Sequence, residues 1–218
     1  FAAIHEPKIQ VGKDRYQLPE RHILSSVNEA PEAFGERVLD TLDALYDLDQ
    51  VKTIYCHGDG GSWIETIQEL IPGSIPILDH FHLEKALLKV CRGDRKLRTR
   101  LRKCLNPWDD QKLQEELQML VDSDVCDEEK ARDLGVYLYN HQQAIINHFT
   151  LDHGGSCAEG LVSHVFSKRF SRDPLAWSVN SLRKLSHVRS HLENGGKLHP
   201  TMLRPAKPVD EKIAPVFE

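Results

Sequence analysis

The fold is decided by the stretch VKTIYCHGDGGSWIETIQELIPGSIPILDHFHL, residues 51–83. Residues 51–55 form a short apolar run typical of a strand, and a Gly-rich turn follows it. A helix is expected to begin near Ser62, and a second apolar run at 75–78 predicts another strand. A strand, a tight turn, a helix and a strand make a βαβ unit, in which the two strands pair in parallel.

Two carboxylates follow the two strands of this unit. Asp59 lies in the turn after the first strand, and Asp79 directly follows the second. Because the carboxyl ends of parallel strands meet at one edge of a sheet, we expect both side chains at that edge, where open α/β sheets hold ligands. Glycines at positions 58, 60 and 61 let the backbone turn sharply, so that Asp59 can project into a crevice.

The composition is that of a globular protein. The 218 residues, 40% of them hydrophobic, suffice for one large domain or for one domain with an insertion. A net charge of −5 and a pI near 6.2 give no overall attraction to nucleic acid, although an average hides local patches. The chain begins at Phe1, without a methionine and in strand-like residues, so we expect it to be a fragment.

The cysteines and the hydropathy predict a cytoplasmic protein. The five cysteines, at positions 56, 91, 104, 126 and 157, are widely spaced and form no CxxC pair, and there is no secretory leader. We therefore expect reduced thiols. No apolar run is long enough to span a bilayer, so a membrane is not expected as a partner.

The residues before the βαβ unit predict a hairpin and a helix. Residues 1–10 and 15–24 are extended segments joined by a short turn. Residues 28–48 carry apolar side chains at helical spacing, so this helix is expected to cover a sheet. The element order up to Asp79 is then ββαβαβ.

After Asp79 the pattern becomes helical. Residues 82–150 contain no convincing strand, and breaks are expected at Gly93, at Asn106 with Pro107, and over 122–127. The expected domains are a first core part at 1–83, an all-helical insertion at 84–150, C-terminal core helices at 151–199, and an irregular tail at 200–218.

The insertion begins with a basic run. It comprises Lys85, Lys89, Arg92, Arg95, Lys96, Arg98, Arg100, Arg102 and Lys103. Such a run can contact the phosphates of DNA, each neutralised phosphate adding salt-dependent affinity. A solvated helix face that pairs with the acidic segment at 109–133 explains the same run, and the sequence leaves both interpretations open.

A third stretch of interest is GGSCAEGLVSHVFSKRF, residues 154–170. Ser156 with Glu159 three residues later, before an apolar run, is a capping-box pattern, which is a complete structural explanation of Glu159. The functional alternative is that the Glu159 carboxylate points across the loop towards Asp59, with Gly154 and Gly155 giving the backbone room. The local sequence alone favours the cap.

Three motifs, in this order and spacing, resemble the signature segments of bacterial insertion-sequence transposases of the ISLre type, long described only as an uncharacterised protein family. They are GDGGSWI at 58–64, LDHFHLEKAL at 78–87 and SCAEGLVSHVFSKRFSRDPLAWS at 156–178. The later NGGK at 194–197 is similar to the end of the family pattern. The resemblance covers most of the chain from Ile4 onwards.

The resemblance implies an α/β fold of the ribonuclease H-like type, a mixed sheet flanked by helices, with the all-helical insertion before the helix of the third acidic residue. Three acidic residues of this fold hold two Mg²⁺ or Mn²⁺ ions. Asp59 matches the second and Glu159 the third, and both are expected to be catalytic. Asp79 and His82 match a D-x-x-H element beside the active site. The first acidic residue is expected upstream of Phe1.

The implied function is DDE-type transposition: cleavage and transfer of DNA strands at insertion-sequence ends, by an oligomer associated with the nucleoid. Two metal ions suit this chemistry because one activates the attacking oxygen and the other stabilises the leaving oxygen. With the first carboxylate missing, the fragment alone is expected to be inactive.

Two other functions stay open. A different metal-dependent phosphoesterase would use HGDGG and DHFH, with His57, His80 and His82 converging with Asp59 on one metal. An inactive remnant would only bind DNA or a protein partner, through the basic run at 85–103.

Overall fold

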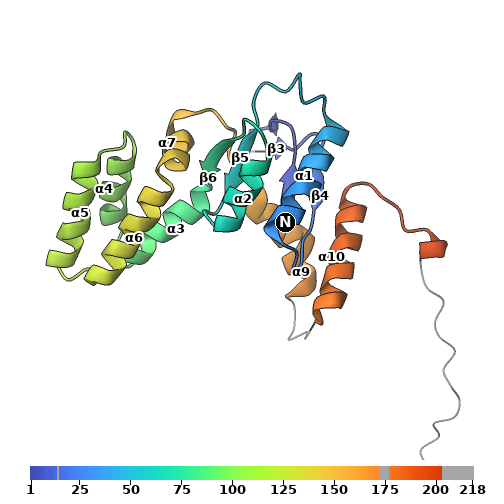
Figure 1. Cartoon of the computed structure of the whole chain (residues 1–218). Coiled ribbons are helices and arrows are strands. Elements are labelled where there is room, and N and C mark those ends of the chain that lie inside the picture. Colours follow the sequence, from blue (N-terminus) through green and yellow to red (C-terminus); the bar gives the residue numbers. More distant parts are fainter. Residues whose placement is uncertain (14, 172–176, 203–218) are drawn as a thin grey trace, which may run out of the picture.

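The computed structural model describes residues 1–13, 15–171 and 177–202 (Figure 1). It is a mixed α/β structure in which the described strands form three two-stranded sheets. The short strands and the first two helices lie together in the middle of the view, a group of helices extends to one side, and the last long helix lies on the other. In the described part of the chain, no helix has the length and apolar character needed to cross a membrane.

The predicted βαβ unit is confirmed. Strand β5 (Tyr55–Gly58) and strand β6 (Ile75–Leu78) pair in parallel, and helix α2 (Ser62–Leu70) connects them. The prediction that the first strand begins at Val51 is wrong by four residues. The ladder starts where Tyr55 meets Ile75, the first residue of β6, so the residues before Tyr55 have no strand to pair with.

The predicted N-terminal hairpin is confirmed as two separate pairs of short antiparallel strands. Strand β1 (Ala2–Ile4) pairs with β4 (His22–Leu24), and β2 (Ile9–Gly12) pairs with β3 (Arg15–Gln17). Pro7 and Pro19 lie between the two pairs. Because proline has no N–H to donate to a ladder, both positions interrupt the pairing.

Helix α1 (Pro31–Leu45) is the expected helix, shorter at both ends than the predicted range 28–48. Pro31 occupies its first turn, where a missing N–H costs nothing. Its side chains Phe34, Val38 and Leu42 are buried in a small core with β1, β4 and α2. Leu45, expected on the same apolar face, is exposed at the C-terminal end of the helix.

Residues 80–150, all described, form five helices: α3 (His80–Val90), α4 (Arg95–Leu105), α5 (Asp110–Asp122), α6 (Glu128–Asn140) and α7 (Gln142–Thr150). The three predicted breaks are confirmed, and a fourth lies at His141. The side chains of Asp79, Asp94, Asp109 and Asp127 accept hydrogen bonds from backbone N–H groups and begin the first four helices. These helices share a large apolar core of their own.

Helix α7 returns the chain to the sheet. It packs against β6, and the buried Asn147 donates a hydrogen bond from its side-chain amide to the Pro76 carbonyl, at 2.9 Å. This bond satisfies a strand carbonyl that would otherwise lack a partner in an apolar contact. The helical unit is therefore tied to the βαβ unit at both of its ends.

The C-terminal part contains α8 (Ala158–Leu161), a π-helical turn η1 (Val162–Ser167), α9 (Lys168–Phe170), α10 (Val179–Glu193) and a 3₁₀ turn η2 (Pro200–Met202). Asn194, the first residue of the NGGK motif, accepts from the N–H of Ile23 at 2.8 Å and donates to the carbonyl of Ile23 at 2.9 Å. Its side chain thus continues the ladder beside β4. Of the predicted irregular tail, residues 203–218 lie outside the described residues.

Candidate active site at the strand ends

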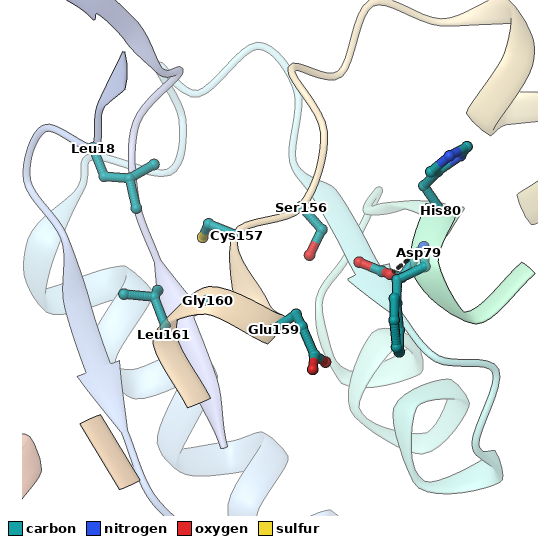
Figure 2. A pocket seen from close by; sticks show the side chains of 9 residues that line it. Leu18, Asp79, His80, Ser156, Cys157, Glu159, Gly160 and Leu161 are labelled. Atoms are coloured by element: carbon teal, nitrogen blue, oxygen red, sulfur yellow. Dashed lines mark hydrogen bonds between the residues drawn. The ribbon is translucent and has the colours of Figure 1, made fainter. Parts of the chain in front are cut away.

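A cleft of about 470 Å³ separates the end of β6 from the loop that leads into α8. Asp79 and Glu159 lie on facing sides of this cleft (Figure 2), although they are far apart in the sequence. Ser156, Cys157 and Phe81 also line it. The fold therefore brings the second and third motifs together at the C-terminal edge of the parallel strands.

Asp79 is buried, with 9% of its surface exposed, and is the N-cap of helix α3. Its Oδ1 accepts from the N–H of Phe81 at 2.9 Å, and its own N–H donates to the Gly58 carbonyl at 2.7 Å. These bonds fix the residue between strand and helix. In the described residues the second carboxylate oxygen has no hydrogen-bond partner, so it remains available to a ligand.

Asp59 lies at the end of the neighbouring strand, as predicted, because Gly58 pairs with Leu78 in the last step of the ladder. Its Oδ1 accepts from the N–H of Gly61 at 2.9 Å, which again leaves one carboxylate oxygen free within the described residues. Asp59 does not line the cleft of Asp79 and Glu159. The sheet edge thus carries two acidic residues, and the one that faces Glu159 across the cleft is Asp79.

The turn that contains Asp59 is held by helix α6 and the residue after it. Tyr137 donates from its hydroxyl to the Asp59 carbonyl at 3.4 Å, and His141 Nε2 donates to the Gly60 carbonyl at 2.8 Å. Gly60 has a φ of 85°, and a Cβ on it would clash with the imidazole ring of His141. Only glycine therefore fits this turn beneath the helix.

Tyr137 is kept in its neutral, donating form. Burial raises the pKa of its phenol to about 12, and the negative charges of Asp59 and Asp79 act in the same direction. The hydroxyl consequently lies in the field of both carboxylates. Nothing in the sequence around Tyr137 or His141 indicated this contact.

Glu159 is exposed in the first turn of α8. The predicted capping box is wrong, because the helix begins one residue later than it requires: Cys157 is the N-cap, and Ser156 Oγ accepts from the N–H of Ala158 at 3.1 Å. In the described residues the Glu159 carboxylate has neither a hydrogen bond nor an ion pair. The structural explanation of Glu159 thus fails, and its carboxylate is free to face the cleft.

The loop before α8 is shaped by two glycines and a lysine. Gly154 and Gly155 have φ values of 67° and 70°, a region that favours glycine. Lys8 donates from Nζ to the Ser156 carbonyl at 3.1 Å, so the N-terminal segment supports the loop from outside.

Four histidines form a row behind the acidic residues. Ring centroids are 4.9 Å apart for His57 and His153, 5.2 Å for His153 and His148, and 5.4 Å for His148 and His80. His153 accepts from the Gly155 N–H with Nδ1 at 3.1 Å and donates from Nε2 to the His148 carbonyl at 3.2 Å. The row therefore links β5 to the loop before α8.

Two members of the row, His57 and His148, are uncharged at neutral pH. Burial lowers the pKa of His57 to about 4, and the neighbouring His153 adds to this. Burial, followed by the neighbouring His153 and His80, lowers the pKa of His148 to about 4. Sequence motifs singled out His57 and His80 but missed His148, which lies on α7, and His153, which lies in the loop before α8.

His82 and Asp59 do not join the row. The His82 ring contacts Phe81, at a centroid distance of 5.3 Å. Within residues 1–13, 15–171 and 177–202, no three or more His, Cys, Asp and Glu side chains are grouped as metal ligands. The convergence of His57, His80 and His82 with Asp59, which the phosphoesterase alternative requires, is not what the described residues show.

The carboxylates nonetheless have the donor chemistry that a hard divalent cation requires. Asp59 and Asp79 each keep one oxygen uncommitted in the described residues, and Glu159 keeps both. Mg²⁺ binds through one or two carboxylates and retains several waters, so a few free oxygens at a cleft suit it.

Three of the nine side chains of the basic run form ion pairs. Arg98 and Arg102 pair with Glu84 at 3.2 and 3.4 Å, and Arg100 pairs with Glu116 at 2.9 Å. Only the last pair joins the run to the acidic segment that follows it. The other six members are exposed and form no ion pair in the part of the chain that the structure describes: Lys85, Lys89, Arg92, Arg95, Lys96 and Lys103.

Comparison with known proteins gives a family without a described function. The model of the uncharacterised protein family UPF0236 matches residues 1–204. Two UPF0236 proteins of Caldanaerobacter subterraneus subsp. tengcongensis are each 31% identical over 198 residues; the match covers 89% of this chain and 42% and 40% of the relatives. The chain thus spans about two fifths of their length. The printed name of a third relative joins eleven locus designations of that strain. No solved structure matches the chain.

Proposed function

The chain belongs to the uncharacterised protein family UPF0236, and we propose that it is part of the catalytic core of a DDE-type transposase, which cuts and joins DNA strands at insertion-sequence ends. The observation that carries the proposal is the meeting of Asp79 and Glu159 across one cleft, with Asp59 at the end of the adjacent strand. Acidic residues from distant motifs share one sheet edge, as a metal-dependent phosphoryl-transfer site requires.

The names of the relatives give independent support. One joins eleven locus designations of a single strain, and another joins four. A gene is expected to recur at many loci of one genome when it belongs to an element that copies itself or moves.

The proposed fold is ribonuclease H-like. Among the described strands none pairs with the second edge of β5, and the proposed fold places the strand of the first acidic residue there. Glu6, which follows β1, is not at this sheet edge, and Asp14 lies outside the described residues.

In the proposed mechanism Asp59 and Glu159 would hold two Mg²⁺ or Mn²⁺ ions, and Asp79, which faces Glu159 across the cleft, would offer its free oxygen to the same site. When bound, the ions supply an activated attacking oxygen and a stabilised leaving oxygen. Tyr137 and His141 fix the Asp59 turn, and the six unpaired basic side chains at the start of the helical unit hold the DNA backbone. His82 is placed beside the site and not in the cleft.

A titration with Mn²⁺ tests the proposal on this chain. We expect the electron paramagnetic resonance signal of free Mn²⁺ to decrease on adding the protein, and each of Asp59→Asn, Asp79→Asn and Glu159→Gln to weaken that binding. Glu129→Gln, which removes an exposed carboxylate of α6, is the matched control and should leave binding unchanged. Equal binding by all four variants would overturn the assignment. If the unmodified chain binds no Mn²⁺ but binds DNA in a salt-dependent way, the inactive DNA-binding remnant is favoured instead.

A further inference from the structure

Phe81 is a large aromatic side chain on the wall of the acidic cleft. It is the second residue of α3, it lines the same cleft as Asp79 and Glu159, and 47% of its surface is exposed. Its backbone N–H donates to the Asp79 carboxylate, which fixes the start of the helix and hence the position from which the side chain projects. An exposed apolar side chain alone needs no explanation. Its place in a cleft lined by carboxylates does.

Two lysines follow Phe81 along the same face of α3. Lys85 is four residues later, and its Nζ lies 5.8 Å from the centroid of the Phe81 ring. Lys89 is a further four residues along, and both ammonium groups lack an ion-pair partner in the described residues. Steps of four residues keep side chains on one helix face and advance by roughly 6 Å. The helix therefore presents a ring and two positive charges in line, leading away from the carboxylates.

We propose that Phe81 is a stacking platform for an unpaired nucleobase, held beside the acidic residues while Lys85 and Lys89 contact the phosphates that flank it. The inference rests on the proposed function and adds to it the form of the substrate at the site: a locally single-stranded nucleotide. Every base has a π-face, so an aromatic ring binds bases without sequence preference. The cleft volume of about 470 Å³ is of the size that holds small organic ligands.

The arrangement has an electrostatic reason. Asp79 and Glu159 repel a phosphate until cations neutralise them, so a neutral ring provides attraction to the nucleotide that does not depend on charge. Lys85 and Lys89, one and two turns further along α3, attract phosphates at a place outside the cleft that Asp79 and Glu159 line. Base and backbone are thus held by separate groups, and their contributions are separable by experiment.

The test is a set of fluorescence anisotropy titrations of the 218-residue chain with a labelled single-stranded oligonucleotide in Mg²⁺. Phe81→Leu keeps an apolar side chain but removes the π-face, and we expect it to weaken binding by about five- to 150-fold with an unchanged salt dependence. Phe81→Trp should retain or improve affinity. Tyr16→Leu, which removes an exposed aromatic ring from β3, is the matched control and should bind like the unmodified chain.

An abasic scan separates stacking from general contact. In the unmodified chain, removing the base at one position of the oligonucleotide should cost as much as Phe81→Leu, and in Phe81→Leu the same removal should cost nothing further. Lys85→Gln and Lys89→Gln should each lower the slope of affinity against salt. If Phe81→Leu and the abasic sites act additively, or if Phe81→Leu binds normally while the lysine variants bind weakly, the stacking site is wrong and DNA binding stands. If the unmodified chain binds no oligonucleotide, the proposed function fails with it.

Discussion

The helical unit, α3 to α7, and the α/β part around it differ in the number of side chains that are buried in their cores. In the described residues sixteen buried side chains form the core of the helical unit, together with the end of β6, whereas seven form the core between α1, α2, β1 and β4. The α/β part is built on two-stranded sheets, which are weak structures by themselves. The acidic cleft lies where the two regions meet. We infer that the helical unit, which has the larger core, supports the site at its border with the part that has the smaller core.

The largest expected effect comes from the core of the helical unit. Leu113 is fully buried in it, and Leu113→Ala should lower the free energy of unfolding by about 3 kcal/mol, because it removes apolar contacts and leaves a cavity. Urea denaturation measures this. Leu45→Ala, at an exposed position of α1, is the control and should change the stability by less than about 0.5 kcal/mol. Similar losses of unfolding free energy for both variants would contradict the conclusion that the core of the helical unit contributes strongly to stability.

Acid should lower the free energy of unfolding, because protons bind to histidines of the row that links β5 to the loop before α8. The pKa values of His57 and His148 are lowered to about 4 in the folded chain, from 6.5, so the unfolded chain binds protons first as the pH falls. The contribution of these two groups to stability is therefore fully present above pH 6.5 and is lost as the pH falls towards 4. Denaturation at a series of pH values should show a shallower loss for His148→Asn. An unchanged slope in that variant would contradict the assignment.

Asn147 should matter more than its neighbour on the same helix. Asn147→Ala removes the amide that donates to Pro76 O, leaves a strand carbonyl unpaired, and should cost about 1 to 3 kcal/mol. Gln143→Ala removes only an exposed side chain that donates to Asn147, and should lower the free energy of unfolding by only a few tenths of that amount. The comparison is made by thermal unfolding. Equal costs would mean that α7 is not fastened to β6 through this bond.

Tyr137→Phe should have the smallest effect, about 1 kcal/mol, because it removes one long hydrogen bond to the Asp59 carbonyl. Its signature is in alkali. The folded pKa of about 12 lies above the ordinary value of 10, so the contribution of Tyr137 is present below pH 10 and is lost as the pH rises through 12. Phenolate absorbance should show a tyrosine that titrates near pH 12 and that Tyr137→Phe lacks, besides Tyr46, whose pKa burial also raises. A titration with the same late step in both proteins would place that group elsewhere.

The regions also differ in how far the sequence predicted them. Strand β6 and the breaks near Gly93 and Pro107 were correct because an apolar run or a helix breaker acts locally. The start of β5 was wrong because a strand begins where its partner begins. The capping box at Ser156 failed because the helix starts one residue later.

The contacts that shape the site could not be predicted at all. Tyr137 and His141 meet the Asp59 turn across 78 and 81 residues of sequence, and His153 packs between His57 of β5 and His148 of α7. No local pattern records such contacts, since they arise only when two separately folded regions pack together. The sequence thus indicated the acidic residues but not the side chains that hold them.

The most direct measurement of the central claim is a crystal structure of the chain soaked in Mn²⁺, with anomalous data collected at the manganese edge. The account predicts a peak at the C-terminal edge of β5 and β6, with carboxylate oxygens of Glu159 and of Asp59 or Asp79 at the roughly 2.0 to 2.2 Å expected of a small divalent cation. A cleft without a peak, or a peak held by other residues, would contradict it.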